Sequence, residues 1–100
     1  MWNHNYYMYI TTNPGKTTLY VGMTNDVGIR AFQHKENRGT NNSFAGKYYC
    51  YCLVYYEHFT HVEQAIAREK EVKKWRREKK LALIESINPE WRFLNDEVGG

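Results

Sequence analysis

The sequence predicts a small domain of mixed structure, an α/β (α+β) fold in which two strands are followed by a helix, a third strand and further helices. Residues 5–12 and 19–24 are rich in aromatic, apolar and β-branched side chains, as strands are. The turn sequence at 13–16 joins these two strands into an antiparallel hairpin. Residues 60–75 and 78–87 carry the apolar spacing of helices that bury one face.

The hairpin is predicted to bring two tyrosines together. Side chains alternate along a strand, so Tyr7 and Tyr9 share one face of the first strand. Pro14-Gly15 predicts a type II turn, in which the glycine takes the positive φ. A loop centred on these two residues pairs positions whose numbers sum to 29, which places Tyr9 opposite Tyr20 on the same face.

The second strand leads directly into a predicted helix from about Asp26 to Asn37, with Asn25-Asp26 as its capping residues. Arg30 and His34 are four positions apart, so their side chains leave the same side of that helix. A strand that supplies Tyr20, followed by a helix that supplies an arginine and a histidine, indicates a functional site. The alternative is an ordinary β-α unit with a surface arginine and histidine.

The third predicted strand, residues 47–57, is dominated by tyrosine, cysteine, leucine and valine, which favours the centre of the sheet. Cys50 and Cys52 are too close along one strand to form a disulfide, and no histidine stands at zinc-ligand spacing, so we expect reduced thiols in the core. Thr60 and Glu63 have the spacing of a capping box that begins the next helix.

That helix contains an acidic residue in an unexpected place. At 100° per residue, Glu69 falls at the centre of an apolar stripe formed by Val62, Ala65, Ile66 and Val72. A carboxylate on a buried face costs free energy unless it is paired or binds a metal. Glu69 is therefore either a metal ligand or part of a core salt bridge, with Arg30 or Lys73 as its partner.

The charge of the chain is weakly positive but unevenly distributed. Lys and Arg number 14 against 11 Asp and Glu, for a net charge of +3. Residues 68–80 contain eight basic and three acidic residues, which indicates either an anionic partner or a solvated helix face. No signal peptide or membrane-spanning run is visible, so we expect a cytoplasmic protein without a membrane partner.

Several ordered motifs together resemble the signature of the GIY-YIG endonucleases. They are Tyr7-Met8-Tyr9, Tyr20-Val21-Gly22, Arg30 with His34, and Glu69. The resemblance covers nearly the whole chain, so residues 1–100 are expected to form one domain, and it is strongest to small stand-alone bacterial members. The sequence departs from the family in two places: Tyr7 replaces the first glycine, and Ala45-Gly46 replaces a frequent Thr-Lys pair.

The resemblance implies a three-stranded antiparallel sheet flanked by helices and an enzyme that hydrolyses phosphodiester bonds in DNA with Mg²⁺ or Mn²⁺. It implies that Glu69 binds the metal ion, that Arg30 contacts the phosphate, and that Tyr9 or Tyr20 is the general base. The five implied catalytic residues are Tyr9, Tyr20, Arg30, His34 and Glu69. We expect them to meet in one cleft.

The nucleic acid is expected to contact Lys47 and the basic run, at Lys73, Lys74, Arg76 and Arg77. One hundred residues leave no room for a separate recognition domain, so sequence specificity should be weak, or directed by the structure of the substrate or by a protein partner. The competing interpretation is a nucleic-acid-binding or interaction module that keeps the fold and has little catalytic activity.

Overall fold

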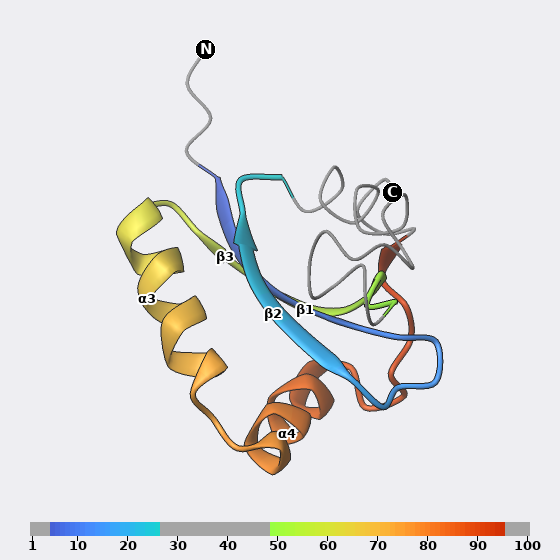
Figure 1. The fold of residues 1–100 in the computed structure, drawn as a ribbon. Coiled ribbons are helices and arrows are strands. Elements are labelled where there is room, and N and C mark those ends of the chain that lie inside the picture. Colours follow the sequence, from blue (N-terminus) through green and yellow to red (C-terminus); the bar gives the residue numbers. More distant parts are fainter. Residues whose placement is uncertain (1–4, 27–48, 96–100) are drawn as a thin grey trace.

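The computed structural model describes residues 5–26 and 49–95, which form an antiparallel sheet with two helices packed on one face (Figure 1). In chain order the elements are β1 (Tyr6–Thr12), β2 (Leu19–Thr24), β3 (Cys52–Phe59), α3 (Val62–Lys73) and α4 (Arg77–Ile87). The sheet has three strands in the order β2-β1-β3. This arrangement confirms the predicted α+β fold, while the predicted helix at 26–37 lies outside the described residues.

The turn between β1 and β2 lies at the predicted residues but has a different geometry. The backbone N–H of Lys16 donates to the carbonyl of Asn13 at 2.9 Å, which closes a turn around Pro14-Gly15. The positive φ belongs to Lys16, at 59°, and not to Gly15. The prediction of a type II turn with a left-handed glycine was therefore wrong.

The side chain of Asn13 also shifts the strand pairing. Its Oδ1 accepts hydrogen bonds from the backbone N–H groups of Thr17 at 2.8 Å and Thr18 at 2.9 Å. These bonds hold both threonines in the loop, so the pairing of β1 with β2 begins only at Thr12 and Leu19. Paired residue numbers sum to 31, and the predicted sum of 29 was wrong because the loop is longer on its β2 side.

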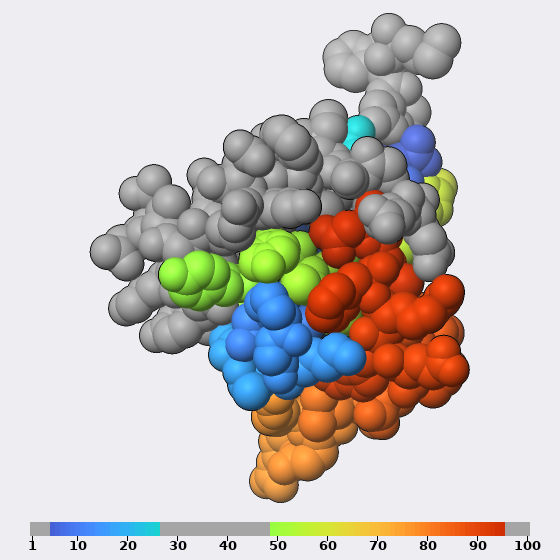
Figure 2. All heavy atoms as spheres, turned by 90° about the vertical axis from the view of Figure 1, so that its right-hand side faces the viewer, coloured from blue at the N-terminus to red at the C-terminus, as the bar shows by residue number. Residues whose placement is uncertain are grey.

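The central strand is β1, which pairs with both neighbours, so the prediction that the third strand is central was wrong. Strand β3 buries residues on both faces: Val54 belongs to the main core, and Leu53 packs with Leu94 on the other face. The C-terminal segment also covers the outer edge of β3. The N–H of Leu94 donates to Leu53 O at 2.7 Å, and Asn95 Oδ1 accepts from Leu53 N at 3.0 Å. Figure 2 shows this segment against the residues of β3.

The main core lies between the sheet and the two helices. Met8 and Ile10 of β1 pack with Val72 of α3 and Ile84 of α4, and all four are fully buried. The opposite face of the sheet carries a second, smaller buried cluster of three residues, Tyr9, Leu53 and Leu94. Neither described helix is long and apolar enough to cross a membrane.

The start of α3 differs from the prediction. The N-cap is His61, and within the described residues no side chain caps the helix there. Thr60 therefore precedes the cap, and Glu63 is the second residue of the helix rather than the third, so the pair cannot form a capping box. The end of α4 at Ile87, directly before Asn88-Pro89, agrees with the predicted stop.

The two cysteines are buried in the core and form no disulfide, as predicted. Burial, together with the neighbouring Cys52, raises the pKa of the Cys50 thiol to about 11. Cys50 therefore stays protonated at neutral pH and behaves as a small apolar side chain.

Candidate active site

The hairpin brings Tyr9 and Tyr20 together on one face of the sheet. Tyr9 pairs with Gly22, and Tyr20 pairs with Thr11, so the two tyrosines are diagonal neighbours rather than directly opposite. Their ring centroids are 6.2 Å apart, with an angle of 47° between the planes. The tyrosines remain neighbours although the predicted register was wrong, because a shift of two residues leaves every side chain on its original face.

Gly22 makes room for this pair. A methyl group on Gly22 would lie 2.6 Å from Tyr9 Cζ and 3.0 Å from Tyr20 Cε2, and closer still to Tyr9 Oη. The ring of Tyr9 therefore lies directly over the backbone of β2, in space that any other residue would fill. The glycine of the Tyr20-Val21-Gly22 motif has a steric role that the sequence analysis did not assign.

The two tyrosines differ in exposure. Tyr9 is 3% exposed and packs with Leu53 and Leu94. Tyr20 is only partly buried against the same cluster. Solvent therefore reaches Tyr20 more readily than Tyr9. This difference separates the two candidates for the general base, which the sequence alone does not.

Glu69 lies in the layer on the other side of the sheet. Helix α3 packs through Ala65 and Val72 on the face opposite the tyrosines. The Glu69 side chain is 17% exposed, and its Oε2 is 2.8 Å from Lys73 Nζ. The salt bridge between Glu69 and Lys73, one of the two predicted interpretations of Glu69, is therefore present. Lys73 is half exposed, so the pair lies at the margin of the core.

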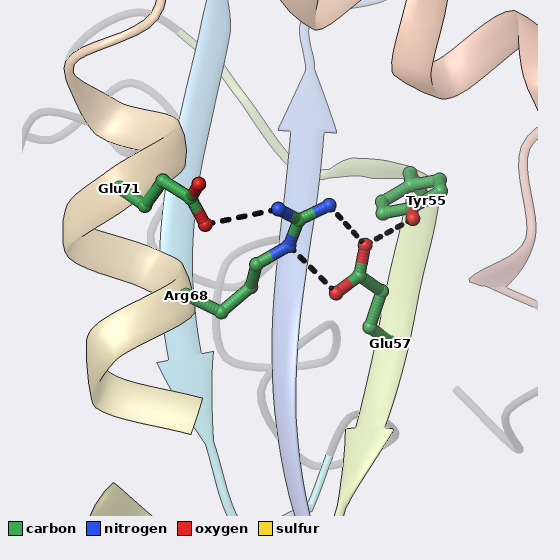
Figure 3. A network of polar contacts seen from close by, with 4 residues as sticks. All are labelled: Tyr55, Glu57, Arg68 and Glu71. Carbon is green, nitrogen blue, oxygen red and sulfur yellow. Dashed lines mark hydrogen bonds and ion pairs between the residues drawn. The ribbon is translucent and has the colours of Figure 1, made fainter. Parts of the chain in front are cut away.

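The position of Glu69 around the helix indicates where it can meet Tyr20. Arg68 and Glu69 are 100° apart on α3 and flank the buried line of Ala65 and Val72 on opposite sides. Arg68 reaches across the sheet to β3 (Figure 3), so Glu69 lies on the flank toward β2. Because β2 is an edge strand of the described sheet, only a site around its outer edge could include both Tyr20 and Glu69. The described contacts do not join Glu69 to the tyrosines, so the expected meeting of Tyr9, Tyr20, Arg30, His34 and Glu69 in one cleft stays a prediction.

A network of polar side chains joins α3 to β3 (Figure 3). The guanidinium of Arg68 donates to both oxygens of Glu57, through Nε at 2.9 Å and Nη2 at 3.0 Å. Its Nη1 donates to Glu71 at 3.0 Å, and the hydroxyl of Tyr55 donates to Glu57 Oε2. Hydrogen bonds to Glu57 raise the pKa of Arg68, and burial followed by the bond to Glu57 raises the pKa of Tyr55.

This network controls the rotation of α3 on the sheet. A bidentate arginine–carboxylate pair has a fixed geometry, so Arg68 and Glu57 define which side of α3 faces β3. Glu69 follows Arg68 directly and is held on the opposite flank as a result. The network was not predicted from the sequence. Glu57 is two residues from the helix-facing Tyr55 and therefore lies on the same face of β3, where a carboxylate needs a partner.

The remaining predicted site residues are distributed as follows. Arg30, His34 and Lys47 lie outside the described residues. Lys73 belongs to the last turn of α3, Lys74 is its C-cap, and the other two predicted contacts, Arg76 and Arg77, begin α4. All four are exposed.

The described residues contain no group of three or more histidine, cysteine, aspartate or glutamate side chains that could hold a metal ion. Glu69 contributes a single carboxylate that is partly accessible. A single carboxylate fits Mg²⁺, which commonly binds one or two protein carboxylates and completes its shell with water and substrate phosphate. The donor available at Glu69 is thus compatible with the metal that the resemblance implies.

The described residues form an α+β domain with a tyrosine pair on its first hairpin and a partly buried glutamate on α3. The model of the GIY-YIG catalytic domain matches residues 5–82. The chain therefore belongs to the GIY-YIG family, whose members are generally endonucleases that act on nucleic acid.

The similar proteins are small bacterial chains named UPF0213. The UPF0213 protein of Bacillus pumilus is 32% identical over 90 residues, covering 90% of this chain and 89% of that protein. A UPF0213 protein of Staphylococcus aureus is 37% identical over 67 residues, covering 67% of this chain and 79% of that protein. The solution NMR structure of a UPF0213 protein from Bacillus halodurans matches with a TM-score of 0.51 and 28% identity, covering 84% of this chain and 86% of that one.

Proposed function

We propose that the protein is a metal-dependent endonuclease that hydrolyses phosphodiester bonds in DNA, with weak sequence specificity or with selection by substrate structure. The observation that carries this proposal is the close pair of Tyr9 and Tyr20 over Gly22. This packing occurs within a chain that belongs to a nuclease family. Glycine beneath an aromatic ring also occurs in sheets without catalytic function, so it is the family membership that gives this pair a chemical meaning.

Each part of the proposed reaction is assigned to a different side chain of the protein. Arg30 binds the scissile phosphate and stabilises the charge that develops in the transition state. Tyr20, the more exposed of the two tyrosines, accepts a proton from the attacking water, and Tyr9 supports its ring. A free tyrosine has a pKa of about 10, so the positive charge of Arg30 and His34 is needed to make the phenolate accessible.

Glu69 is the residue that would hold the divalent ion, Mg²⁺ or Mn²⁺. A bound ion supplies positive charge that stabilises the leaving oxygen of the phosphodiester. Lys73 occupies one oxygen of Glu69 at 2.8 Å and keeps the carboxylate in place without an ion. Lys47 and the exposed residues Lys73, Lys74, Arg76 and Arg77 contact the phosphate backbone.

The test is Glu69→Gln, compared with Glu63→Gln, an exposed glutamate on the same helix. Both proteins are incubated with supercoiled plasmid in Mg²⁺, Mn²⁺ or a chelator, and nicking is measured. Glu69→Gln should abolish nicking. It should change stability by no more than about 1 kcal/mol, since the pair with Lys73 is partly exposed.

Nicking by Glu69→Gln at the wild-type rate would reject the metal-ligand role. Loss of nicking in Glu63→Gln as well would show that charge on α3, and not the Glu69 site, is responsible. Tyr20→Phe and Tyr9→Phe, assayed on the same plasmid, assign the base: Tyr20→Phe should cost more activity. The reverse order would exchange the two roles.

A further inference from the structure

A groove lies where the β1–β2 turn meets α4 and the C-terminal segment. It is open to solvent, has a volume of about 350 Å³, and is lined by Lys16, Arg77, Leu81, Glu90 and Trp91. Small-molecule sites begin at about 300 Å³, so the groove can hold a ligand the size of one nucleotide. None of its lining residues belongs to the tyrosine site described above.

Two contacts hold the cationic residues of the groove in place. Arg77 Nη2 donates to the backbone carbonyl of Lys16 at 3.5 Å, which joins α4 to the turn. Lys16 has a φ of 59°, and its Nζ lies 5.5 Å from the centre of the Phe93 ring. The two cations therefore stand together at the junction of the turn, α4 and the C-terminal segment.

The groove lining also includes an apolar and an aromatic side chain. Leu81 follows Arg77 by one helical turn, so both side chains lie on the same side of α4. Trp91 is partly buried, and its indole Nε1 donates to Glu85 Oε2 at 3.2 Å. That bond and the packing of Trp91 on the main core hold the ring in position. Glu90 is the single acidic residue among those that line the groove.

We propose that this groove binds one unpaired nucleotide of a nucleic-acid strand. Lys16 and Arg77 contact the phosphate, while the base lies against Trp91. Glu90 also lines the groove and repels a phosphate, so Lys16 and Arg77 are the residues that hold the charged group. A paired base within a duplex is stacked and cannot enter, so the groove selects single-stranded or branched substrates. This proposal rests on the proposed function only in taking nucleic acid as the partner.

The charge arrangement favours a nucleotide over a peptide. Two exposed cations beside an indole ring match a phosphate joined to a flat aromatic group. Stacking of one base on an aromatic side chain changes affinity by between about fivefold and a hundredfold. A peptide with acidic side chains would satisfy the two cations but would leave the indole wall without a flat partner.

Binding in a chelator, where no cleavage takes place, tests the proposal. Fluorescence anisotropy is measured with a labelled oligothymidylate, an abasic strand of equal length and a duplex of equal length. The variant is Lys16→Gln with Arg77→Gln, and the control is Lys70→Gln with Lys74→Gln, which removes the same charge from α3. Thermal melts verify that both variants fold.

We expect the groove variant to weaken binding of the oligothymidylate at least fivefold more than binding of the duplex, while the control weakens both equally. The wild type should bind the abasic strand at least fivefold more weakly than the oligothymidylate. Trp91→Leu should remove that difference, provided its melt shows a folded protein. If Trp91→Leu does not fold, quenching of fluorescence by the oligothymidylate is measured in Trp2→Phe with Trp75→Phe, where Trp91 is the remaining tryptophan; absence of quenching on binding would overturn the contact with the base.

Equal weakening of single strand and duplex by the groove variant would overturn the proposal, as would tighter binding of a polyglutamate peptide than of the oligothymidylate. The two proposals fail separately. Glu69-dependent nicking with an inactive groove would leave the nuclease and remove the nucleotide site. Groove-dependent binding without any nicking would support the nucleotide site and reject the nuclease activity.

Discussion

Replacing Gly22 by alanine tests the packing on which the candidate site depends. In a strand this change alone would be favourable by about 0.5–1 kcal/mol, because glycine loses more conformational freedom on folding than alanine. The added methyl group, however, would lie 2.6 Å from Tyr9 Cζ. Tyr9 is 3% exposed and packs against Leu53 and Leu94, so its ring has no free space to move into.

Overpacking of this kind costs about 1–3 kcal/mol, and the immobile ring favours the upper end. The net effect is a loss of about 1–2 kcal/mol from a total stability of about 5–15 kcal/mol. For a domain of this size, the melting temperature should fall by about 4–16 °C. Nicking activity should fall as well, because Tyr9 and Tyr20 can no longer keep their relative positions.

Thermal melts of Gly22→Ala are compared with Gly15→Ala, a matched change in the turn, where the nearest atoms are 3.6 and 4.0 Å away. Gly15→Ala should leave the melting temperature within a few degrees of the wild type. Adding Tyr9→Leu to Gly22→Ala removes the ring and should abolish the cost of the alanine. The steric role of Gly22 would be refuted if Gly22→Ala did not lower the melting temperature, or if it lowered the melting temperature equally in the Tyr9→Leu background.

Three other predictions follow from the described contacts. Arg68→Met leaves the partly buried carboxylate of Glu57 without its cation and should lower the free energy of unfolding, measured in urea, by about 2–3 kcal/mol. Lys73→Met should lower it by less than about 1 kcal/mol, because the pair with Glu69 is partly exposed. The pKa of Cys50 rises from 9.0 to about 11 on folding, so the contribution of its protonated thiol to the free energy of unfolding is complete below pH 9 and is lost as the pH rises to 11. Thermal melts over this pH range should show the loss, and Cys50→Ala should not. Lys74→Glu with Arg76→Glu should flatten the salt dependence of DNA binding, and an unchanged slope would assign both residues to solvation.

The strands and their faces could be predicted from the sequence because alternation is a local property. Tyr7 and Tyr9 do lie on one face, and Met8 and Ile10 on the other. The register could not be predicted, since it depends on hydrogen bonds that one side chain, Asn13, makes with two backbone N–H groups. An alternation rule contains no information about such a bond.

The position of β3 could not be predicted for a different reason. Its apolar composition is that of a central strand, but the cover for its edge comes from Leu94 and Asn95, far along the chain. In the candidate site, the neighbourhood of Tyr9 and Tyr20 could be predicted because both belong to one hairpin, whereas the catalytic roles of these residues and of Glu69 stay predictions. The Arg68–Glu57 pair was missed because its members come from two elements whose relative placement is decided only by folding.

The cover over β3 has a consequence for the order of events during synthesis. Strand β3 ends at Phe59, whereas the groups that satisfy the backbone of Leu53 belong to Leu94 and Asn95. At about 5–20 residues per second, a ribosome needs about 2–7 s to add the intervening chain. During that interval the N–H and C=O of Leu53 can pair with the strand of another nascent chain. Pairing of this uncovered edge with a second chain is therefore the misassembly to expect before the C-terminal segment has been made.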